Sequence, residues 1–176
     1  AEGRHYYNAT RRSADDLVAV KSTEEFQNML PDAVSCITIW NPSNGEPKLL
    51  LNREFRYPAG QFLLSVPAGL IDPADKEEDE PLLVTAKREL KEETGLKLEP
   101  IVVDDIYQKP YYTSVGMTDE CCGTVYGYAS GEISKKYMED SEEIEVVLAD
   151  RKEVARILKE ERVAIMCAYM LMHFVA

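Results

Sequence analysis

The segment RELKEETGL, from Arg88 to Leu96, places three carboxylates on one short stretch of predicted helix. Glu92 and Glu93 lie three and four positions after Glu89, so their side chains are neighbours of the Glu89 side chain on a helix. Like charges at that spacing destabilise a helix by about 0.2–0.5 kcal/mol per pair. A chain with this segment must either leave the carboxylates in solvent or compensate their repulsion elsewhere in the fold.

The predicted helix has signals at both ends and an apolar stripe beside the glutamates. Pro81 suits the first turn, with Asp79 or Glu80 as the cap, and Gly95 suits the position after the last turn. At about 100° per residue, the three glutamates span about 100° of arc. The side chains next to that arc are Leu83, Ala86 and Leu90. We therefore expect the glutamates at the edge of the buried face, where desolvation raises the cost of their repulsion.

Two interpretations of the glutamates are open at this point. A glutamate run on a helix is most often a solvated face, and Arg88 offsets part of its charge. The other interpretation is a site for a hard cation, Mg²⁺ or Mn²⁺, which carboxylate oxygens and waters surround octahedrally. The net charge of −12 suits a phosphorylated small molecule held through such a cation. It argues against a nucleic-acid partner, which requires a basic surface.

The ordered string around the helix favours the cation site. It comprises Gly69, Glu80, Arg88-Glu89-Leu90, Glu92-Glu93 and Gly95-Leu96. This string resembles the Nudix box of the Nudix hydrolases, G-x5-E-x7-R-E-U-x-E-E-x-G-U, where U is a bulky aliphatic residue. Ten residues rather than five separate Gly69 from Glu80, which we interpret as a five-residue insertion ahead of the helix. Glu80 is then either the first glutamate of the box or a helix cap.

The resemblance implies a fold, a metal and a set of site residues. The fold is α/β (α+β), a Nudix-fold α/β/α sandwich with a mixed β-sheet and a loop–helix–loop. The metal is Mg²⁺ or Mn²⁺, with Glu89 and Glu93 as ligands and Glu92 as a ligand or the neighbour of one. The backbone carbonyl of Ala68 completes the implied ligand set. Arg88, Glu92 and Glu93 are also implied to take part in catalysis.

Two segments outside the box resemble the ADP-ribose pyrophosphatase branch of this family. In NREFRYP, Arg56, or else Arg53, matches an arginine that binds substrate phosphates, and a surface arginine on a strand is the alternative. In YYTSVGMTDE, Gly116 and Glu120 match a substrate-binding loop, although Val115 replaces the branch's proline. The resemblance implies that Glu120 faces the ribose or a water on the metal, and an ordinary polar loop residue is the alternative.

A third segment, MEDSEEIEVV, is similar to the branch's acidic loop that supplies a general base or a further metal ligand. Glu142 is the best match and Asp140 the second, and a solvated turn is the alternative for both. A base in this position needs only hydrogen-bond reach of a water made acidic by the cation.

The N-terminal residues 1–32 are predicted as a segment separate from the Nudix domain at 33–176. HYYNATRR (5–12) and LVAVKS (17–22) are interpreted as short strands, which in the branch help to build a homodimer or contact substrate. Tyr6 or Tyr7 would stack on adenine, although ordinary strand tyrosines are an equal alternative. A capping-box pattern predicts a helical turn near residues 22–30.

The remaining chain predicts strands and helices without regular βαβ alternation. The predicted strands cover residues 33–40, 48–56, 61–69, 101–112, 121–130 and 142–149, and the later helices cover 150–161 and 163–176. The apolar run at 163–176 is shorter than the roughly 18 residues of a membrane span, so we interpret it as a buried terminal helix. Four scattered cysteines and the lack of a signal peptide favour the cytoplasm.

Taken with the resemblance, these features predict Mg²⁺-dependent hydrolysis of ADP-ribose to AMP and ribose 5-phosphate. The alternatives are another nucleoside-diphosphate sugar, such as GDP-mannose or UDP-glucose, and a non-catalytic Nudix-like binding domain. The expected partners are a small nucleotide substrate and a second copy of the chain in a homodimer, with no membrane and no nucleic acid.

Overall fold

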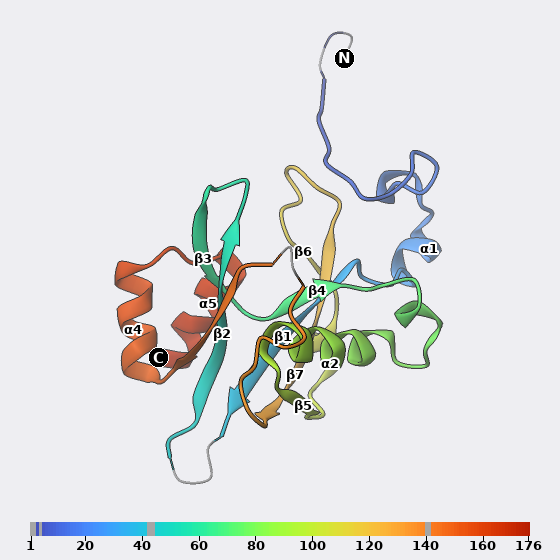
Figure 1. Cartoon of the computed structure of the whole chain (residues 1–176). Helices are drawn as coiled ribbons and strands as arrows, with labels where there is room; N and C mark the ends of the chain where they lie inside the picture. Colours follow the sequence, from blue (N-terminus) through green and yellow to red (C-terminus); the bar gives the residue numbers. More distant parts are fainter. Residues whose placement is uncertain (1–2, 4, 42–44, 140–141) are drawn as a thin grey trace.

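The computed structural model describes residues 3, 5–41, 45–139 and 142–176 (Figure 1). The strands are β1 (Ala33–Trp40), β2 (Lys48–Arg56), β3 (Gln61–Ser65), β4 (Ala68–Leu70), β5 (Lys97–Pro100), β6 (Tyr111–Tyr112), β7 (Cys121–Ser130) and β8 (Ile144–Ala149). The helices are α1 (Thr23–Gln27), α2 (Pro81–Thr94), α3 (Asp105–Gln108), α4 (Arg151–Glu160) and α5 (Ile165–Val175), with 3-10 helices η1 (Val18–Val20) and η2 (Asp75–Glu77). The strands predicted at 33–40, 48–56 and 121–130 are confirmed.

The strands form one mixed sheet with the central order β3-β2-β1-β7-β5. β1 and β7 run parallel, and the other pairs along this path are antiparallel. β8 adds to β2, β4 to β1 and β6 to β7, each antiparallel. In this register Ala68 lies opposite Ser35, so β1 holds the start of the loop–helix–loop next to the centre of the sheet.

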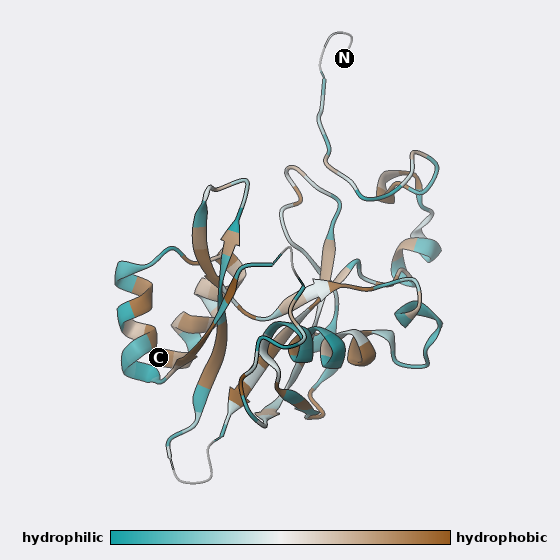
Figure 2. Cartoon of the chain, viewed as in Figure 1, coloured by the Kyte–Doolittle hydropathy of each residue, from teal (hydrophilic) through white to brown (hydrophobic). Residues whose placement is uncertain are grey.

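Side chains alternate between the two faces of the sheet, and helices cover both faces. On β2, Leu50 packs in one core cluster with Ala86 and Leu90 of α2. Its neighbours Leu49 and Leu51 pack in the other cluster, with residues of α4 and α5. Successive side chains of a strand point to opposite faces, so one strand serves both cores. α4 and α5 lie together beside β2 and β3 (Figure 1), and α4 is hydrophilic on one side and hydrophobic on the other (Figure 2). The predicted α/β/α sandwich with a mixed sheet is confirmed.

Helix α2 begins and ends as its sequence predicts. Pro81 is its first residue, where the missing N–H of proline has no helical partner to lose. Gly95 follows the last turn with a φ of 79°, a left-handed conformation that glycine adopts without strain. Glu80 occupies the N-cap position, but its side chain makes no capping hydrogen bond.

Two predicted strand segments, 5–12 and 17–22, are wrong in the structure, and of a third, 101–112, only Tyr111–Tyr112 forms a strand, β6. In residues 5–12, which have no apolar face to bury, the only described pairing is an isolated bridge between Ala9 and Thr118. Residues 18–20 form η1, and the capping box that follows at Ser22 is confirmed. Within 101–112, the Asp104 side chain accepts a hydrogen bond from the Ile106 N–H and starts the short helix α3. This cap favours a helical turn over a strand, although residues 101–103 before it are all β-branched.

The C-terminal helix α5 is only half buried, which corrects the expectation of a buried helix. Cys167 and Leu171 are buried against the sheet, whereas Ile165, Tyr169 and Met172 are largely exposed. Among the described residues, no helix has the length and apolarity that crossing a membrane would require.

Candidate active site

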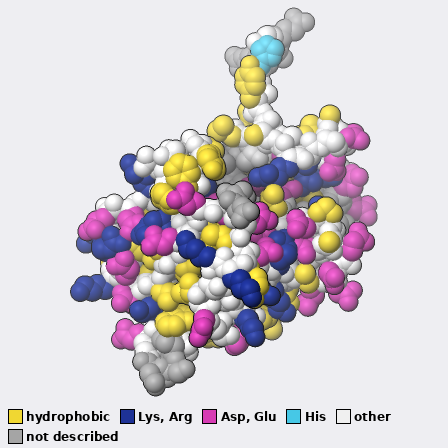
Figure 3. All heavy atoms as spheres, viewed as in Figure 1, with side chains coloured by type: hydrophobic (Ala, Val, Ile, Leu, Met, Phe, Trp, Pro, Cys, Tyr) yellow, Lys and Arg dark blue, Asp and Glu magenta, His cyan; other side chains and the backbone are white. Residues whose placement is uncertain are grey.

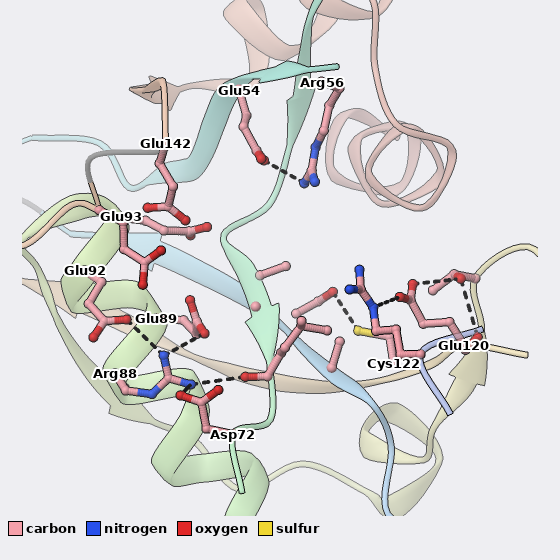
Figure 4. A pocket seen from close by; sticks show the side chains of 18 of the residues that line it. Glu54, Arg56, Asp72, Arg88, Glu89, Glu92, Glu93, Glu120, Cys122 and Glu142 are labelled. Atoms are coloured by element: carbon pink, nitrogen blue, oxygen red, sulfur yellow. Dashed lines mark hydrogen bonds and ion pairs between the residues drawn. The ribbon is translucent and has the colours of Figure 1, made fainter. Parts of the chain in front are cut away.

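A pocket of about 470 Å³ opens between the start of β4, the middle of α2, the end of β2 and the start of β7. One end of the pocket, here called the glutamate end, is formed by Glu54, Arg56, Arg88, Glu89, Glu92, Glu93 and Glu142. The other end, here called the Arg11 end, is formed by Arg11, Ser35, Thr113, Glu120 and Cys122. Figure 4 shows Glu120 and Cys122 across the pocket from Glu89, Glu92 and Glu93.

Gly69 allows the backbone of β4 to lie directly against the glutamates of α2. A Cβ atom at this position would be only 1.9 Å from the Cδ atom of Glu89. Any side chain here would therefore displace the Glu89 carboxylate or separate β4 from α2. Ala68, the residue before it, also lines the pocket, so its backbone is available to the site as the resemblance implied.

Glu93 is the most buried carboxylate of the site, with 4% of its surface exposed. The Nδ2 atom of Asn52 donates a hydrogen bond to its Oε2 atom at 2.8 Å. Burial raises the pKa of Glu93 well above its usual value, and the charges of Glu89 and Glu142 raise it further. A bound cation would strongly stabilise the ionised form of a carboxylate that is buried from solvent among like charges.

Glu89 and Glu92 are both held by Arg88. The Nη1 atom of Arg88 donates to Glu89 Oε1 at 2.8 Å and to Glu92 Oε2 at 2.9 Å. Burial raises the pKa of Glu89 to about 7, although the adjacent Arg88 charge favours the ionised form. Arg88 thus offsets part of the like-charge repulsion noted in the sequence, and the raised pKa of Glu89 favours its uncharged form, which removes a further part.

Arg88 is itself fixed by Asp75, a residue that the sequence analysis did not single out. The buried Asp75 carboxylate accepts hydrogen bonds from Arg88 Nη2 at 2.9 Å and from Thr85 Oγ1 at 2.9 Å. Asp75 follows Gly69 after five residues, whereas Glu80 lies in a separate, mainly apolar pocket with Leu30 and Pro100. This spacing favours Asp75 as the first acid of the box, with the extra residues after it and Glu80 at the N-cap position of α2.

The acidic segment that carries this insertion lies on the surface. Glu77, Glu78 and Asp79 are exposed. In Figure 3, acidic side chains gather on the side of the molecule where η2 and the start of α2 lie. The negative charge of the segment is thus largely solvated, but Asp75 is buried and Asp72 lines the pocket, where it pairs with Arg88.

Alternation along β2 separates the two candidate arginines. Asn52, Glu54 and Arg56 share one face, and Arg56 Nη2 lies 2.6 Å from Glu54 Oε2 inside the pocket. Arg53 points to the other face, where it pairs with Glu145 and Glu161. Of the two candidates, Arg56 therefore lines the pocket, and Arg53 is not part of the described lining. Glu54 was missed, although the period of two that places Arg56 in the pocket also places Glu54 there.

Glu142 reaches the glutamate end from the segment before β8. Burial raises the pKa of its carboxyl, and nearby Glu139 and Glu92 add to the effect. Its Oε2 atom is buried and has no hydrogen-bond partner among the described residues. Asp140, the second candidate from the same segment, lies outside the described residues.

These carboxylates fit a divalent cation chemically, although they are not arranged as a preformed metal site. In the described part of the chain, no three acidic, cysteine or histidine side chains converge as ion ligands. Their side chains are instead held by other hydrogen-bond partners. Arg88 binds Glu89 and Glu92, and Asn52 binds Glu93. The unpaired Oε2 of Glu142 and the buried Glu93 carboxylate, which accepts a hydrogen bond from Asn52, supply oxygen atoms that a hard cation would take.

At the Arg11 end, only one of the two predicted loop residues lines the pocket. Glu120 does so, and it accepts a hydrogen bond from Thr113 Oγ1 at 3.2 Å. Gly116 lies outside the described lining, and its carbonyl accepts a hydrogen bond from the hydroxyl of Tyr6 at 3.0 Å. Tyr6 and Tyr7 are exposed and are not part of the described lining either.

Fold and pocket together define the class of protein, an α/β/α sandwich with a carboxylate-rich site built on a loop–helix–loop. A NUDIX domain model matches residues 29–166. The chain belongs to the Nudix domain family.

Several curated proteins are similar to this chain over part of their length. An uncharacterised Nudix hydrolase of Schizosaccharomyces pombe is 40% identical over 78 residues, 44% of this chain and 34% of that protein. A methanol dehydrogenase activator of Bacillus methanolicus is 29% identical over 137 residues, 76% of this chain and 65% of that protein. An ADP-ribose pyrophosphatase of Bacillus subtilis is 27% identical over 140 residues, with the same 76% and 65% coverage. The chain thus spans 34% to 65% of the length of these curated relatives.

Proposed function

We propose that this protein is a divalent-metal-dependent hydrolase of the diphosphate bond in a nucleoside diphosphate linked to a sugar, with ADP-ribose as the first candidate substrate. The products would be AMP and ribose 5-phosphate. The observation that carries the proposal is the convergence of Glu54, Glu89, Glu92, Glu93 and Glu142 on one pocket beside Arg56. The similarity to the Bacillus subtilis ADP-ribose pyrophosphatase supports the choice of ADP-ribose.

The residues that would hold the cation are Glu89, Glu92, Glu93, Glu142 and the carbonyl of Ala68. A bound Mg²⁺ or Mn²⁺ supplies charge neutralisation at the diphosphate oxygens and makes water a better nucleophile. Asn52 keeps the Glu93 carboxylate in one orientation. Arg88 donates hydrogen bonds to both Glu89 and Glu92 and so keeps their carboxylates together on one face of α2.

Glu142 is the proposed general base, because its pKa is raised and its Oε2 atom lacks a partner among the described residues. Water attacks one phosphorus, and its proton passes to Glu142. The bridging P–O bond breaks, and the leaving phosphate takes the bonding electrons. Asp140 remains the second candidate for the base.

Arg56 is proposed to bind the non-bridging phosphate oxygens. It is paired with Glu54, and the fixed fork of its guanidinium matches two phosphate oxygens at once. Glu54, whose pKa is raised by burial, then helps to hold Arg56 in place. Glu120 is proposed to accept a hydrogen bond from a sugar hydroxyl at the far end of the pocket.

The test is a turnover screen with Mg²⁺ over ADP-ribose, GDP-mannose, UDP-glucose and dinucleotides. We expect ADP-ribose among the best substrates, with AMP and ribose 5-phosphate as the products. If ADP-ribose were among the poorest while another nucleotide sugar was turned over, the reaction class would stand and the substrate would change. Turnover of none of these compounds would favour the non-catalytic binding domain.

A further inference from the structure

The N-terminal segment Ala9–Arg12 folds back along the loop that ends at Glu120. The Ala9 N–H donates to the Met117 carbonyl at 2.8 Å, and Thr10 Oγ1 donates to Asp119 Oδ2 at 3.1 Å. The segment is thus attached to its own chain by backbone and side-chain contacts before it reaches the pocket.

Arg12 fixes the end of this segment against the sheet. Its guanidinium forms an ion pair with Asp32, and only 14% and 15% of the two side chains are exposed. The other Asp32 oxygen accepts a hydrogen bond from the Cys121 N–H at 3.0 Å. Ion pairs that are mostly buried and share further hydrogen bonds hold their residues in one arrangement.

Arg11 is held far more loosely than Arg12, although the two are adjacent. Its one hydrogen bond to another described residue runs from Nε to Glu120 Oε2 at 3.4 Å, and 65% of the side chain is exposed. A long, exposed ion pair of this kind contributes little to stability. Its terminal nitrogens make no hydrogen bond within the described part of the chain, so the planar fork is available at the pocket wall.

The other two arginines of the pocket have short ion pairs at the glutamate end. Arg88 is bound by Asp75, Glu89 and Glu92, and Arg56 is bound by Glu54. At the Arg11 end, by contrast, an arginine donor lies beside the Glu120 acceptor. A donor next to an acceptor is the pair that a sugar diol requires, because each hydroxyl both donates and accepts hydrogen bonds.

We propose that Arg11 is a substrate-binding residue, which the N-terminal segment supplies to its own chain's pocket, and that with Glu120 it binds the sugar attached to the nucleoside diphosphate. The inference rests on the proposed function and identifies the part of the substrate that this residue recognises. It also gives the segment a role within one chain, independent of the predicted homodimer.

The experiment compares wild type, Arg11→Ala and a matched control, Arg162→Ala, which also removes one exposed arginine with one weak contact. Two probes are used, ADP-ribose and an alkyl ester of ADP that keeps the diphosphate but has no second sugar. For ADP-ribose, we expect Arg11→Ala to raise KM by about tenfold with kcat within about threefold, as the loss of a charge-assisted hydrogen bond implies. The alkyl ester should have the same KM in all three proteins.

The same comparison is made by binding calorimetry with a chelator present, so that no turnover is needed. There we expect Arg11→Ala to weaken the binding of ADP-ribose by about tenfold and that of the alkyl ester not at all. Equal weakening of both probes, or of neither, would overturn the inference. If wild type bound ADP-ribose through Arg11 but hydrolysed no compound, the inference would stand and the proposed function would fail.

Discussion

The two ends of the pocket hold their arginines in opposite ways. At the glutamate end, Arg88 has carboxylates around it, from Asp75 before the helix and from Glu89 and Glu92 on the helix itself. At the Arg11 end, Arg11 has one long contact to Glu120 and is mostly exposed. An arginine whose donors are all engaged organises other side chains, whereas one with unengaged donors is ready to bind a ligand. The comparison therefore predicts that Arg88 positions the carboxylates of the cation site and that Arg11 contributes to substrate affinity.

The largest effect is expected from Glu93→Gln at the glutamate end. The substitution keeps the shape and an acceptor for Asn52 but removes the most buried charge of the site. We expect kcat to fall by about 10²–10³-fold, the range for loss of one strong electrostatic contact to a reacting group. Steady-state kinetics with saturating Mg²⁺ measures this.

The control for this variant is Glu132→Gln, which also neutralises one glutamate but on the exposed surface. Both variants should have native circular dichroism, and without metal Glu93→Gln should be at least as stable as wild type, because it relieves a buried charge. Near-normal turnover by Glu93→Gln would show that the glutamate end does not work through this carboxylate.

The next effect is a pH dependence of stability without metal. Burial raises the pKa of Glu89 from 4.5 to about 7, and Glu93 shifts in the same direction. Between pH 4.5 and 7 the folded protein then binds more protons than the unfolded chain, so its stability falls as pH rises. At about 1.4 kcal/mol per pKa unit, Glu89 alone accounts for a loss of up to about 3 kcal/mol.

Urea unfolding at pH 5 and pH 8, with chelator or with Mg²⁺, measures this dependence. With chelator we expect lower stability at pH 8. With Mg²⁺ the difference should shrink or reverse, since a ligand that binds only the folded state stabilises it. Glu89→Gln should reduce the fall. Equal stability at both pH values in chelator would contradict the desolvated glutamate end.

A smaller effect is expected when Arg88 loses its anchor. Asp75→Asn removes the charge that holds Arg88, and we expect a loss of about 1–3 kcal/mol of stability together with about tenfold in kcat/KM. The matched control is Glu80→Gln, whose side chain is exposed and makes no cap. It should change stability by less than about 0.5 kcal/mol. If Glu80→Gln were the more damaging of the two, the first acid of the box would be Glu80 after all.

The sequence predicted the fold wherever local pattern and burial agree. β1, β2 and β7 are apolar runs with turn residues around them, and α2 has its own proline start and glycine end, so their bounds follow from local chemistry. In the segments at 5–12, 17–22 and 101–112, β-branched or aromatic residues favour a strand, but the only strand that forms among these described residues is β6 at Tyr111–Tyr112. There short caps such as Asp104 decide the conformation.

For the site, the sequence predicted the contiguous part and missed what the fold assembles from a distance. Glu89, Glu92 and Glu93 lie on one helix, so their proximity can be predicted from their spacing in the sequence. Asp75 joins them only because η2 packs on α2, and Arg11 lines the pocket only because Arg12 attaches the N-terminal segment to Asp32. The five-residue spacing from Gly69 points to Asp75 in the sequence, whereas no local pattern encodes the packing that brings Arg11 to the pocket.

The smallest effect is expected at Gly116, which by resemblance to the ADP-ribose pyrophosphatase branch belongs to a substrate-binding loop. An added Cβ there would meet nothing within 4 Å, and the residue does not have a positive φ. We therefore expect Gly116→Ala to change stability by less than about 0.5 kcal/mol and the KM for ADP-ribose by less than about twofold. Thermal unfolding and steady-state kinetics measure both quantities. A rise in KM as large as that of Arg11→Ala would mean that the 114–118 turn closes onto the sugar, and the Arg11 end would then include this loop.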